Sequence, residues 1–246
     1  MTVNDKLLSI YVDKYKDLAP VLIERNNCIL DEKKKATNPL LLRVDQSWEN
    51  SSLKVMIFGQ ETNRWGWRQE VVGSTNLFEY NLNSIEHLLK LYYDFFYVRN
   101  GISSPFWYFF NSIKMYLSDR IDSSVVWNNI NKIGILDAGC SPIIYDITKN
   151  LFDIVKEEID ILKPDIVIFL TGPRYDEKIK DSLGVFCKND IDNFNISQMC
   201  SIEFETDYGF RKVIRTYHPA YLRRQVLTDK YINQIFRELD NLIELK

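Results

Sequence analysis

The sequence predicts an α/β fold: a three-layer α/β/α sandwich with a central, mostly parallel four-stranded sheet. Short apolar runs typical of buried strands recur along the chain, as at residues 55–58 and 165–170. Amphipathic helical patterns separate these runs, and strands that alternate with helices indicate parallel pairing. Turn residues follow the strands, as at Gly59 and Gly172. We therefore expect helices on both faces of one sheet.

The composition is typical of a globular protein. The chain has 246 residues, of which 46% are hydrophobic, and this suffices for one large domain over residues 1–246. Its formal net charge of −3 argues against a surface coated in basic residues but allows a local basic groove. No apolar run approaches the length of about 18 residues that a membrane span needs, and the N-terminus lacks an apolar signal core. We expect a cytoplasmic protein with no membrane partner.

Cysteine and histidine usage predicts no metal site. The four cysteines are Cys28, Cys140, Cys187 and Cys200. None belongs to a Cys-x-x-Cys pair, so a zinc ribbon is not expected. The chain has only two histidines, His87 and His218, which makes a Cys/His metal site improbable. We expect free thiols, as in a reducing compartment.

The first half of the chain combines one strand with helical additions. Residues 4–26 have apolar residues at helical spacing, and Pro20 is expected to kink or divide this helix. They belong to an N-terminal helical extension over about residues 1–45, which precedes the strand at 53–58. An aromatic-rich helix at 83–98 lies within a helical insertion over about residues 70–100.

The second half alternates helices and strands. Ser104 and Pro105 are expected to start a helix that continues to residue 117, with Ser104 as its N-cap. The remaining elements, in chain order, are a strand at 123–130, a helix at 146–162, a strand at 165–170, a helix at 174–183, strands at 201–204 and 212–216, and a helix at 229–245. The sheet should contain residues 54–58, 124–128, 166–170 and 212–216.

Polar and aromatic side chains follow the first strand. Gly59 lets the backbone turn, and Gln60, Glu61, Trp65 and Trp67 come after it. In open α/β sheets, ligands bind outside the carboxyl ends of strands, so this stretch is predicted to form the wall of a site. The alternative is a polar surface turn whose tryptophans cover the edge of the core.

Two later strands also end in polar groups. Asn128 and Asn129 end the second strand, where an amide suits either a turn or the recognition of a base edge. His218 follows the last strand, within a basic run that includes Arg215, Arg223 and Arg224. Such a run is either a solvated surface or a phosphate-binding site. A histidine before a proline is itself often a structural turn residue.

In this order, the motifs resemble those of the uracil-DNA glycosylase superfamily. Gly59-Gln60-Glu61 is close to the family's Gly-Gln-Asp, and His218-Pro219-Ala220 is similar to its His-Pro-Ser. The resemblance covers roughly residues 53–240 apart from the insertion, and the order of several short motifs gives it moderate specificity. It implies a DNA partner and no cofactor. Some relatives hold an iron–sulfur cluster, but the cysteine spacing here does not match theirs.

The resemblance implies roles for the candidate residues. Glu61 would position or activate the water that attacks the sugar, and His218 would stabilise negative charge on the leaving base. Asn129 would read the base if Lys132 is aligned with the family's lysine, whereas Asn128 would do so if the strand is counted instead.

The other candidates would complete a pocket for a flipped base. Phe106 would stack on the base, and Gln60 would help to bind it. Trp65 or Trp67 would form the wall or lid. The arginines Arg223 and Arg224 would contact DNA phosphate at the rim. Glu61, Phe106, Asn128 or Asn129, and His218 would then have to line one pocket.

Three departures from the family pattern affect these roles. Thr62-Asn63 replaces a proline followed by tyrosine or glycine, and Ala220 lacks a hydroxyl that can hold phosphate. Residues 221–224 replace the usual wedge-bearing loop, in which Leu222 is the candidate wedge.

We therefore predict a DNA glycosylase that hydrolyses the N-glycosidic bond of uracil or another altered base flipped out of DNA. The alternative is a weak or inactive member of the fold that binds nucleic acid or a nucleotide. A third reading, an unrelated small-molecule hydrolase on a similar sheet, also stays open because fold does not fix function.

Overall fold

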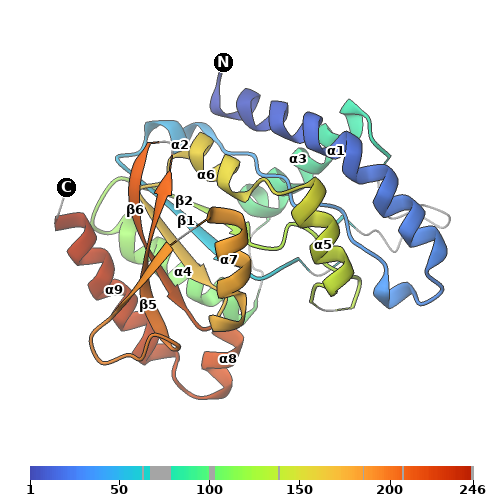
Figure 1. Ribbon diagram of the computed structural model, residues 1–246. Helices are drawn as coiled ribbons and strands as arrows, with labels where there is room; N and C mark the ends of the chain where they lie inside the picture. Colours follow the sequence, from blue (N-terminus) through green and yellow to red (C-terminus); the bar gives the residue numbers. More distant parts are fainter. Residues whose placement is uncertain are drawn as a thin grey trace. The chain divides into compact units, whose positions relative to one another are not determined.

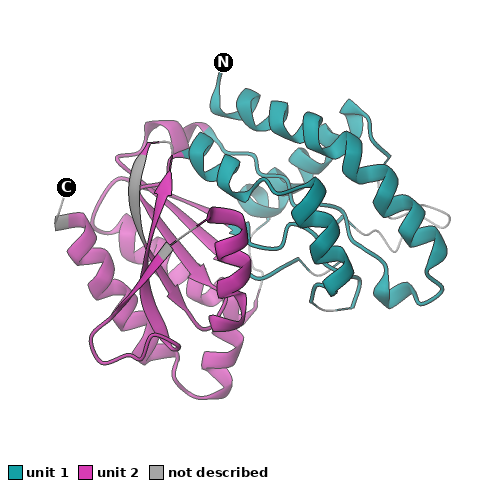
Figure 2. Cartoon of the chain, in the orientation of Figure 1, with its two compact units in different colours: residues 1–45, 60–100, 128–162 teal, residues 46–59, 101–127, 163–246 magenta. Residues whose placement is uncertain are grey.

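The computed structural model describes residues 1–62, 64–66, 79–99, 103–137, 139–184, 186–206 and 208–244 (Figure 1). The chain forms two compact units, which are described separately (Figure 2). Unit 1 contains residues 1–45, 60–100 and 128–162, and unit 2 contains residues 46–59, 101–127 and 163–246. The N-terminal extension and most of the expected insertion thus belong to unit 1.

A six-stranded mixed sheet lies almost wholly in unit 2. Its strands are β1 Leu53–Gly59, β2 Ser123–Asn129, β3 Ile166–Leu170, β4 Phe186–Asp190, β5 Met199–Thr206 and β6 Gly209–Thr216. They lie in the order β2-β1-β3-β6-β5-β4. Strand β3 pairs in parallel with β1 and β6, whereas β5 pairs antiparallel with β6 and β4. Only the last residues of β2, from Asn128 on, belong to unit 1.

The α/β class is confirmed, and the four predicted segments all lie in one sheet. Val55 of β1 pairs with Ile166 of β3, as expected for central parallel strands. The sheet has six strands rather than four, because β4 and β5 extend it beyond β6 with an antiparallel hairpin. Strand β4 was missed because its sequence, Phe-Cys-Lys-Asn-Asp, has no apolar pattern; charged side chains are common on edge strands.

The helices of unit 2 flank this sheet. They are α2 Gln46–Asn50, α4 Pro105–Ser118, α7 Asp176–Leu183, α8 Pro219–Arg224 and α9 Thr228–Glu244, with a 3-10 turn at Pro173–Tyr175 before α7. The Ser104 hydroxyl accepts a hydrogen bond from the Trp107 N–H at 3.3 Å, which confirms the predicted N-cap of α4. Helix α4 contacts both α8 and α9 (Figure 1).

Unit 1 is helical apart from its long connecting segments. Its helices are α1 Val3–Cys28, α3 Leu82–Tyr93, α5 Pro142–Leu151 and α6 Val155–Leu162, with a 3-10 turn at Glu32–Lys34 and a π-helical turn at Asp94–Val98. Helix α1 contacts α3, α5 and α6 (Figure 2). None of the described helices is both long and apolar enough to span a membrane.

Two predicted helices differ from the observed ones. Pro20 does not divide α1, because it lies on the exposed side while Leu18 and Leu22 keep the apolar face buried. The single helix predicted at 146–162 is two helices, α5 and α6. Phe152 leaves the helical conformation, with φ −144° and ψ 37°, and its side chain is buried.

Candidate functional site

In unit 1, the segment after β1 is held by the segment after β2. The Asn131 N–H donates to the carbonyl oxygen of Gln60 at 2.9 Å. The Asn131 side chain donates from Nδ2 to Oε2 of Glu61 at 3.1 Å. Because Asn131 is only 2% exposed, its amide is a fixed donor that orients the half-buried Glu61 carboxylate. Asn131 was not among the residues singled out from the sequence, because its contact with Glu61 joins segments 70 positions apart.

A glycine makes the close approach of these two segments possible. A Cβ added at Gly134 would lie 2.1 Å from the carbonyl oxygen of Thr62, far inside van der Waals contact. Any other residue at position 134 would therefore push the two segments apart. Thr62, a departure from the family pattern, is buried at this contact and 4% exposed.

Of the two tryptophans predicted to form the wall or lid, the structure describes Trp65. Trp65 is 6% exposed and packs edge-to-face on Phe95 of the π-helical turn, with ring centroids 5.3 Å apart. This position fits the alternative in which a tryptophan covers the core, and a lid role for Trp65 stays a prediction. Trp67 lies outside the described residues.

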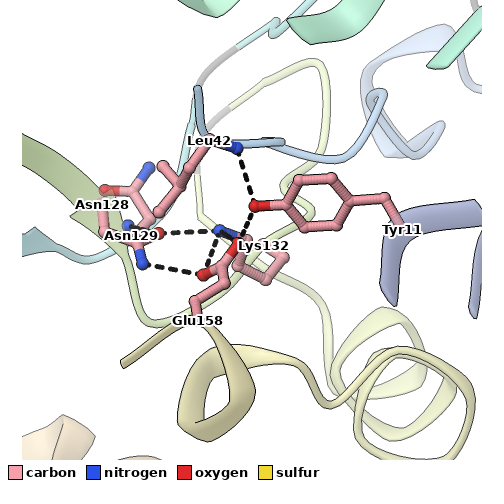
Figure 3. Close-up of polar contacts among 6 residues, drawn as sticks. All are labelled: Tyr11, Leu42, Asn128, Asn129, Lys132 and Glu158. Atoms are coloured by element: carbon pink, nitrogen blue, oxygen red, sulfur yellow. Dashed lines mark hydrogen bonds and ion pairs between the residues drawn. The ribbon is translucent and has the colours of Figure 1, made fainter. Parts of the chain in front are cut away.

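Asn128 belongs to a buried polar network (Figure 3). Its Oδ1 accepts from Lys132 Nζ at 2.7 Å, and its Nδ2 donates to Oε2 of Glu158 at 2.8 Å. Lys132 Nζ also lies 2.9 Å from each carboxylate oxygen of Glu158. On the other side, the Tyr11 hydroxyl donates to Oε1 of Glu158 at 2.7 Å and accepts from the Leu42 N–H at 3.0 Å.

Burial shapes the protonation of this network. Burial, followed by the charge of Glu158, raises the pKa of Tyr11 well above its usual value, so its hydroxyl remains a donor. Burial lowers the pKa of Lys132, while the Glu158 carboxylate opposes that shift. Lys132 and Glu158 are 1% and 0% exposed, respectively, so each is the charge that compensates the other.

The network separates the roles of the two candidate asparagines. Asn128 Oδ1 accepts from Lys132 and from the Asn129 N–H, the latter at 2.7 Å, while its amide nitrogen donates to Glu158. Asn128 would have to break these bonds to bind a base edge. Asn129, which is 2% exposed, is not part of the ion pair, and a base-reading role is retained for it alone.

In unit 2, two of the residues to which the resemblance assigns roles lie together. His218 is the N-cap of α8, and Phe106 lies in the first turn of α4. Their rings are nearly parallel, at 16°, with centroids 6.2 Å apart. Both side chains are half-buried, so an aromatic face and an imidazole share one partly covered surface.

The His218 ring is neutral near pH 7. Burial, together with the positive charge of Arg224, lowers the pKa of His218 from 6.5 to about 4. Its Nδ1 accepts a hydrogen bond from the Ala220 N–H at 3.2 Å. The proton of the neutral ring therefore lies on Nε2, which makes this atom a hydrogen-bond donor.

The lowered pKa makes folding stability depend on pH. Between pH 6.5 and about 4, the unfolded chain binds a proton at His218 that the folded chain does not bind, so stability falls as the pH falls through this window. Each pKa unit corresponds to about 1.4 kcal/mol, so a shift from 6.5 to about 4 predicts a loss of about 3 kcal/mol. Urea unfolding at several pH values should show this loss for the native chain and not for H218N. If the free energy of unfolding depends on pH in the same way in both proteins, the prediction is wrong.

Arg215 is a structural residue rather than part of an exposed basic run. It is 0% exposed, and its Nε and Nη2 donate to the two carboxylate oxygens of Asp176 at 2.9 and 3.1 Å. It also donates to the carbonyl oxygens of Ile196 and Ser197. Arg215 thus ties β6 to α7 and to the connection between β4 and β5, close to where β6 leads into His218.

In the segment after His218, some of the predicted DNA-contacting residues are exposed and one is buried. Arg223 and Arg224, in the last turn of α8, are exposed, as a phosphate contact requires. Leu222 is 0% exposed, so the interpretation of Leu222 as a wedge is wrong. Two large apolar residues nearby are exposed, Tyr221 at 37% and Val226 at 91%.

Among the described residues, no group of three or more His, Cys, Asp and Glu side chains is arranged to hold a metal ion. The prediction that Glu61, Phe106, Asn128 or Asn129, and His218 line one pocket involves residues of both units, and it stays a prediction. Compared with models of known protein families, the chain matches none, and it matches none of the curated proteins with which it was compared.

Proposed function

We propose that the protein is a DNA glycosylase of the uracil-DNA glycosylase type, which hydrolyses the N-glycosidic bond of uracil or another altered base. The observation that carries this proposal is the pairing of Phe106 with a neutral His218 whose Nε2 donates. Phe106 supplies a face on which a flipped base can stack. A fixed donor stabilises the negative charge that develops on a carbonyl oxygen of the leaving base.

The general base of the proposed reaction is the Glu61 carboxylate. Bond cleavage gives the sugar positive character and requires a water molecule on the side opposite the base. A carboxylate serves both needs, because it stabilises the cation and takes a proton from the water. The fixed amide of Asn131 supports this role, since it orients one oxygen of the Glu61 carboxylate.

Base reading is assigned to Asn129, assisted by Gln60. Asn128 is instead assigned a positioning role, since its amide groups bind Lys132 and Glu158. Glu61 and Asn129 belong to unit 1, and His218 and Phe106 belong to unit 2.

DNA contact is assigned to the loop after α8. Val226 has φ +55°, a left-handed conformation that is unfavourable for a β-branched side chain. It follows the C-cap residue Gln225, and the Leu227 N–H donates to the Leu222 carbonyl oxygen at 2.9 Å. Glycine is the usual residue after such a helix end. A strained and exposed valine beside Arg223 and Arg224 supports a role as the apolar residue that enters the DNA.

Replacement V226G should separate stability from DNA contact. Glycine relieves the strain, so the free energy of unfolding is expected to rise by about 1 kcal/mol. Affinity for DNA that carries the target base should fall at the same time. V226T, which keeps the size and branching, is the matched control and should retain the stability of the native chain. Unchanged DNA affinity in V226G would remove Val226 from the proposed contact.

The proposed activity is tested with labelled oligonucleotides that carry uracil, hypoxanthine or xanthine in single or double strands. Alkali cleaves the strand wherever a base has been removed. We expect cleavage for at least one of these bases and a loss of roughly 100- to 1,000-fold in H218A, as when a donor to a developing oxyanion is removed. Cleavage that is equal in H218A and the native chain would contradict the proposal.

A second candidate function is binding without cleavage, in which a nucleic acid or nucleotide is held but not cut. Ala220 favours it, because this residue replaces the hydroxyl that would hold a phosphate near the scissile nucleotide. Salt-sensitive binding of oligonucleotides without any strand cleavage would support this function in place of the first.

A further inference from the structure

The ion pair between Lys132 and Glu158, both in unit 1, is buried, and both of its members are hydrogen-bonded (Figure 3). Buried ion pairs contribute little to stability compared with apolar residues of the same size, because both charges lose their hydration. The effect of this pair on its neighbouring residues therefore matters more than its contribution to the free energy of unfolding.

The pair determines which way the Asn128 amide faces. Lys132, a donor, holds Oδ1, and Glu158, an acceptor, holds Nδ2, so a flipped amide would oppose both partners. With Oδ1 held, the same atom accepts the Asn129 N–H at 2.7 Å. The orientation of the Asn128 side chain thereby sets the backbone at Asn129.

The segment of residues 128–132 also contacts Glu61. The carbonyl oxygen of Lys132 accepts from the Leu40 N–H at 2.8 Å, which fixes the main chain on the far side of Asn131. Asn131 then contacts both the backbone of Gln60 and the carboxylate of Glu61. Asn131 is thus anchored on both sides, by Asn129 before it and by Lys132 after it.

Tyr11 joins the N-terminal helix to this arrangement. Its hydroxyl, which is held in its protonated form, connects Glu158 to the Leu42 N–H. Tyr11 is 0% exposed and lies 147 positions from Glu158 in the sequence. Helix α1 therefore reaches the ion pair directly, in addition to packing on α5 and α6.

We propose that Lys132, Glu158 and Tyr11 are positioning residues that hold Asn129 and the Asn131–Glu61 pair in place. Through Tyr11, the N-terminal helix α1 then helps to position the residues of the proposed site. The assignment of Asn129 and Glu61 to base reading and catalysis rests on the proposed function, whereas the positioning itself is a property of unit 1.

The test measures hydrogen exchange of the Asn129 and Asn131 amides by NMR. These N–H groups bond to Asn128 Oδ1 and the Gln60 carbonyl, so their exchange reports on the arrangement without any substrate. In the variant Y11F/K132M/E158L, apolar residues replace all three proposed positioning residues. Exchange of both amides should become about tenfold faster or more relative to the Ile168 amide in β3 of unit 2.

Variant K156M is the matched control. It removes a lysine from a surface ion pair with Asp160 on α6, the helix that also carries Glu158. Exchange at Asn129 and Asn131 should be unchanged. The milder variant Y11F keeps the ion pair and covers the case in which the triple variant does not fold; it should also accelerate exchange at Asn129. Unchanged exchange in a folded triple variant, or in Y11F if the triple variant does not fold, would overturn the proposal.

Measurements of base removal then distinguish the positioning role from the glycosylase assignment. If the native chain removes a base, Y11F should alter the ratio of kcat/KM between two altered bases, an effect that a loss of stability alone does not produce. If exchange accelerates but the native chain removes no base, the positioning role stands and the glycosylase assignment fails. If exchange is unchanged in the variants while the native chain removes a base, the glycosylase assignment stands and the positioning role fails.

Discussion

Replacement of Glu61 by Gln is expected to lower the rate of base excision by about 100- to 10,000-fold, the usual contribution of a positioned acid–base group. Glutamine has nearly the same shape and still accepts the hydrogen bond that Asn131 donates. It cannot take a proton from water, and it carries no charge to stabilise a cationic sugar. The loss should therefore appear in the single-turnover rate of strand cleavage after alkali treatment.

Variant E157Q provides the control for this prediction. Glu157 also carries a carboxylate in unit 1, but it lies on α6 in an exposed ion pair with Lys14. E157Q should cleave at the rate of the native chain, and both variants should unfold at the same urea concentration as the native chain. A rate for E61Q within about twofold of the native rate would remove Glu61 from the chemistry.

Replacement of Lys132 by Met should destabilise the protein by about 3–5 kcal/mol, because it leaves the Glu158 charge buried without its partner. The pair is 1% and 0% exposed, so water cannot replace the missing ammonium without opening unit 1. Urea unfolding monitored by circular dichroism gives this difference directly.

The double variant K132M/E158L distinguishes the cost of an unpaired charge from the value of the pair. Replacing both members by apolar residues of similar size is often neutral or stabilising. We expect most of the stability lost in K132M to return in the double variant. If K132M/E158L is as unstable as K132M, the pair is a major source of stability, and the argument for a positioning role weakens.

Local sequence pattern was sufficient for the parallel part of the sheet. Strands β1 and β3 contain uninterrupted apolar runs at 55–58 and 166–170, as is typical of central strands in an α/β fold, and they pair in parallel as expected. Strand β4 is polar and lies at an edge, where burial imposes no pattern on the sequence. The apolar pattern therefore revealed the centre of the sheet but not its full width.

The candidate site was predictable only in part, for a related reason. His218 and Phe106 were found through local motifs, and the structure brings them together in unit 2. The partners of Asn128 could not be found in this way. Glu158 lies 30 positions from Asn128 on another element, and no local motif links it to Asn128 or to Lys132, its buried ion-pair partner.

The parallel pairing of β1 with β3 also determines an order of events during folding. The Lys54 N–H donates to the carboxylate of Asp165, which lies 111 positions further along the chain, whereas β5 and β6 meet across the short turn between Thr206 and Gly209. Contacts close in sequence form early, and distant ones wait for a large loop to close. On the ribosome, the apolar run of β1 emerges long before its partner strand has been made. We expect nascent chains that end before β3 to be bound by chaperones through residues 55–58, because exposed apolar strands are prone to aggregate.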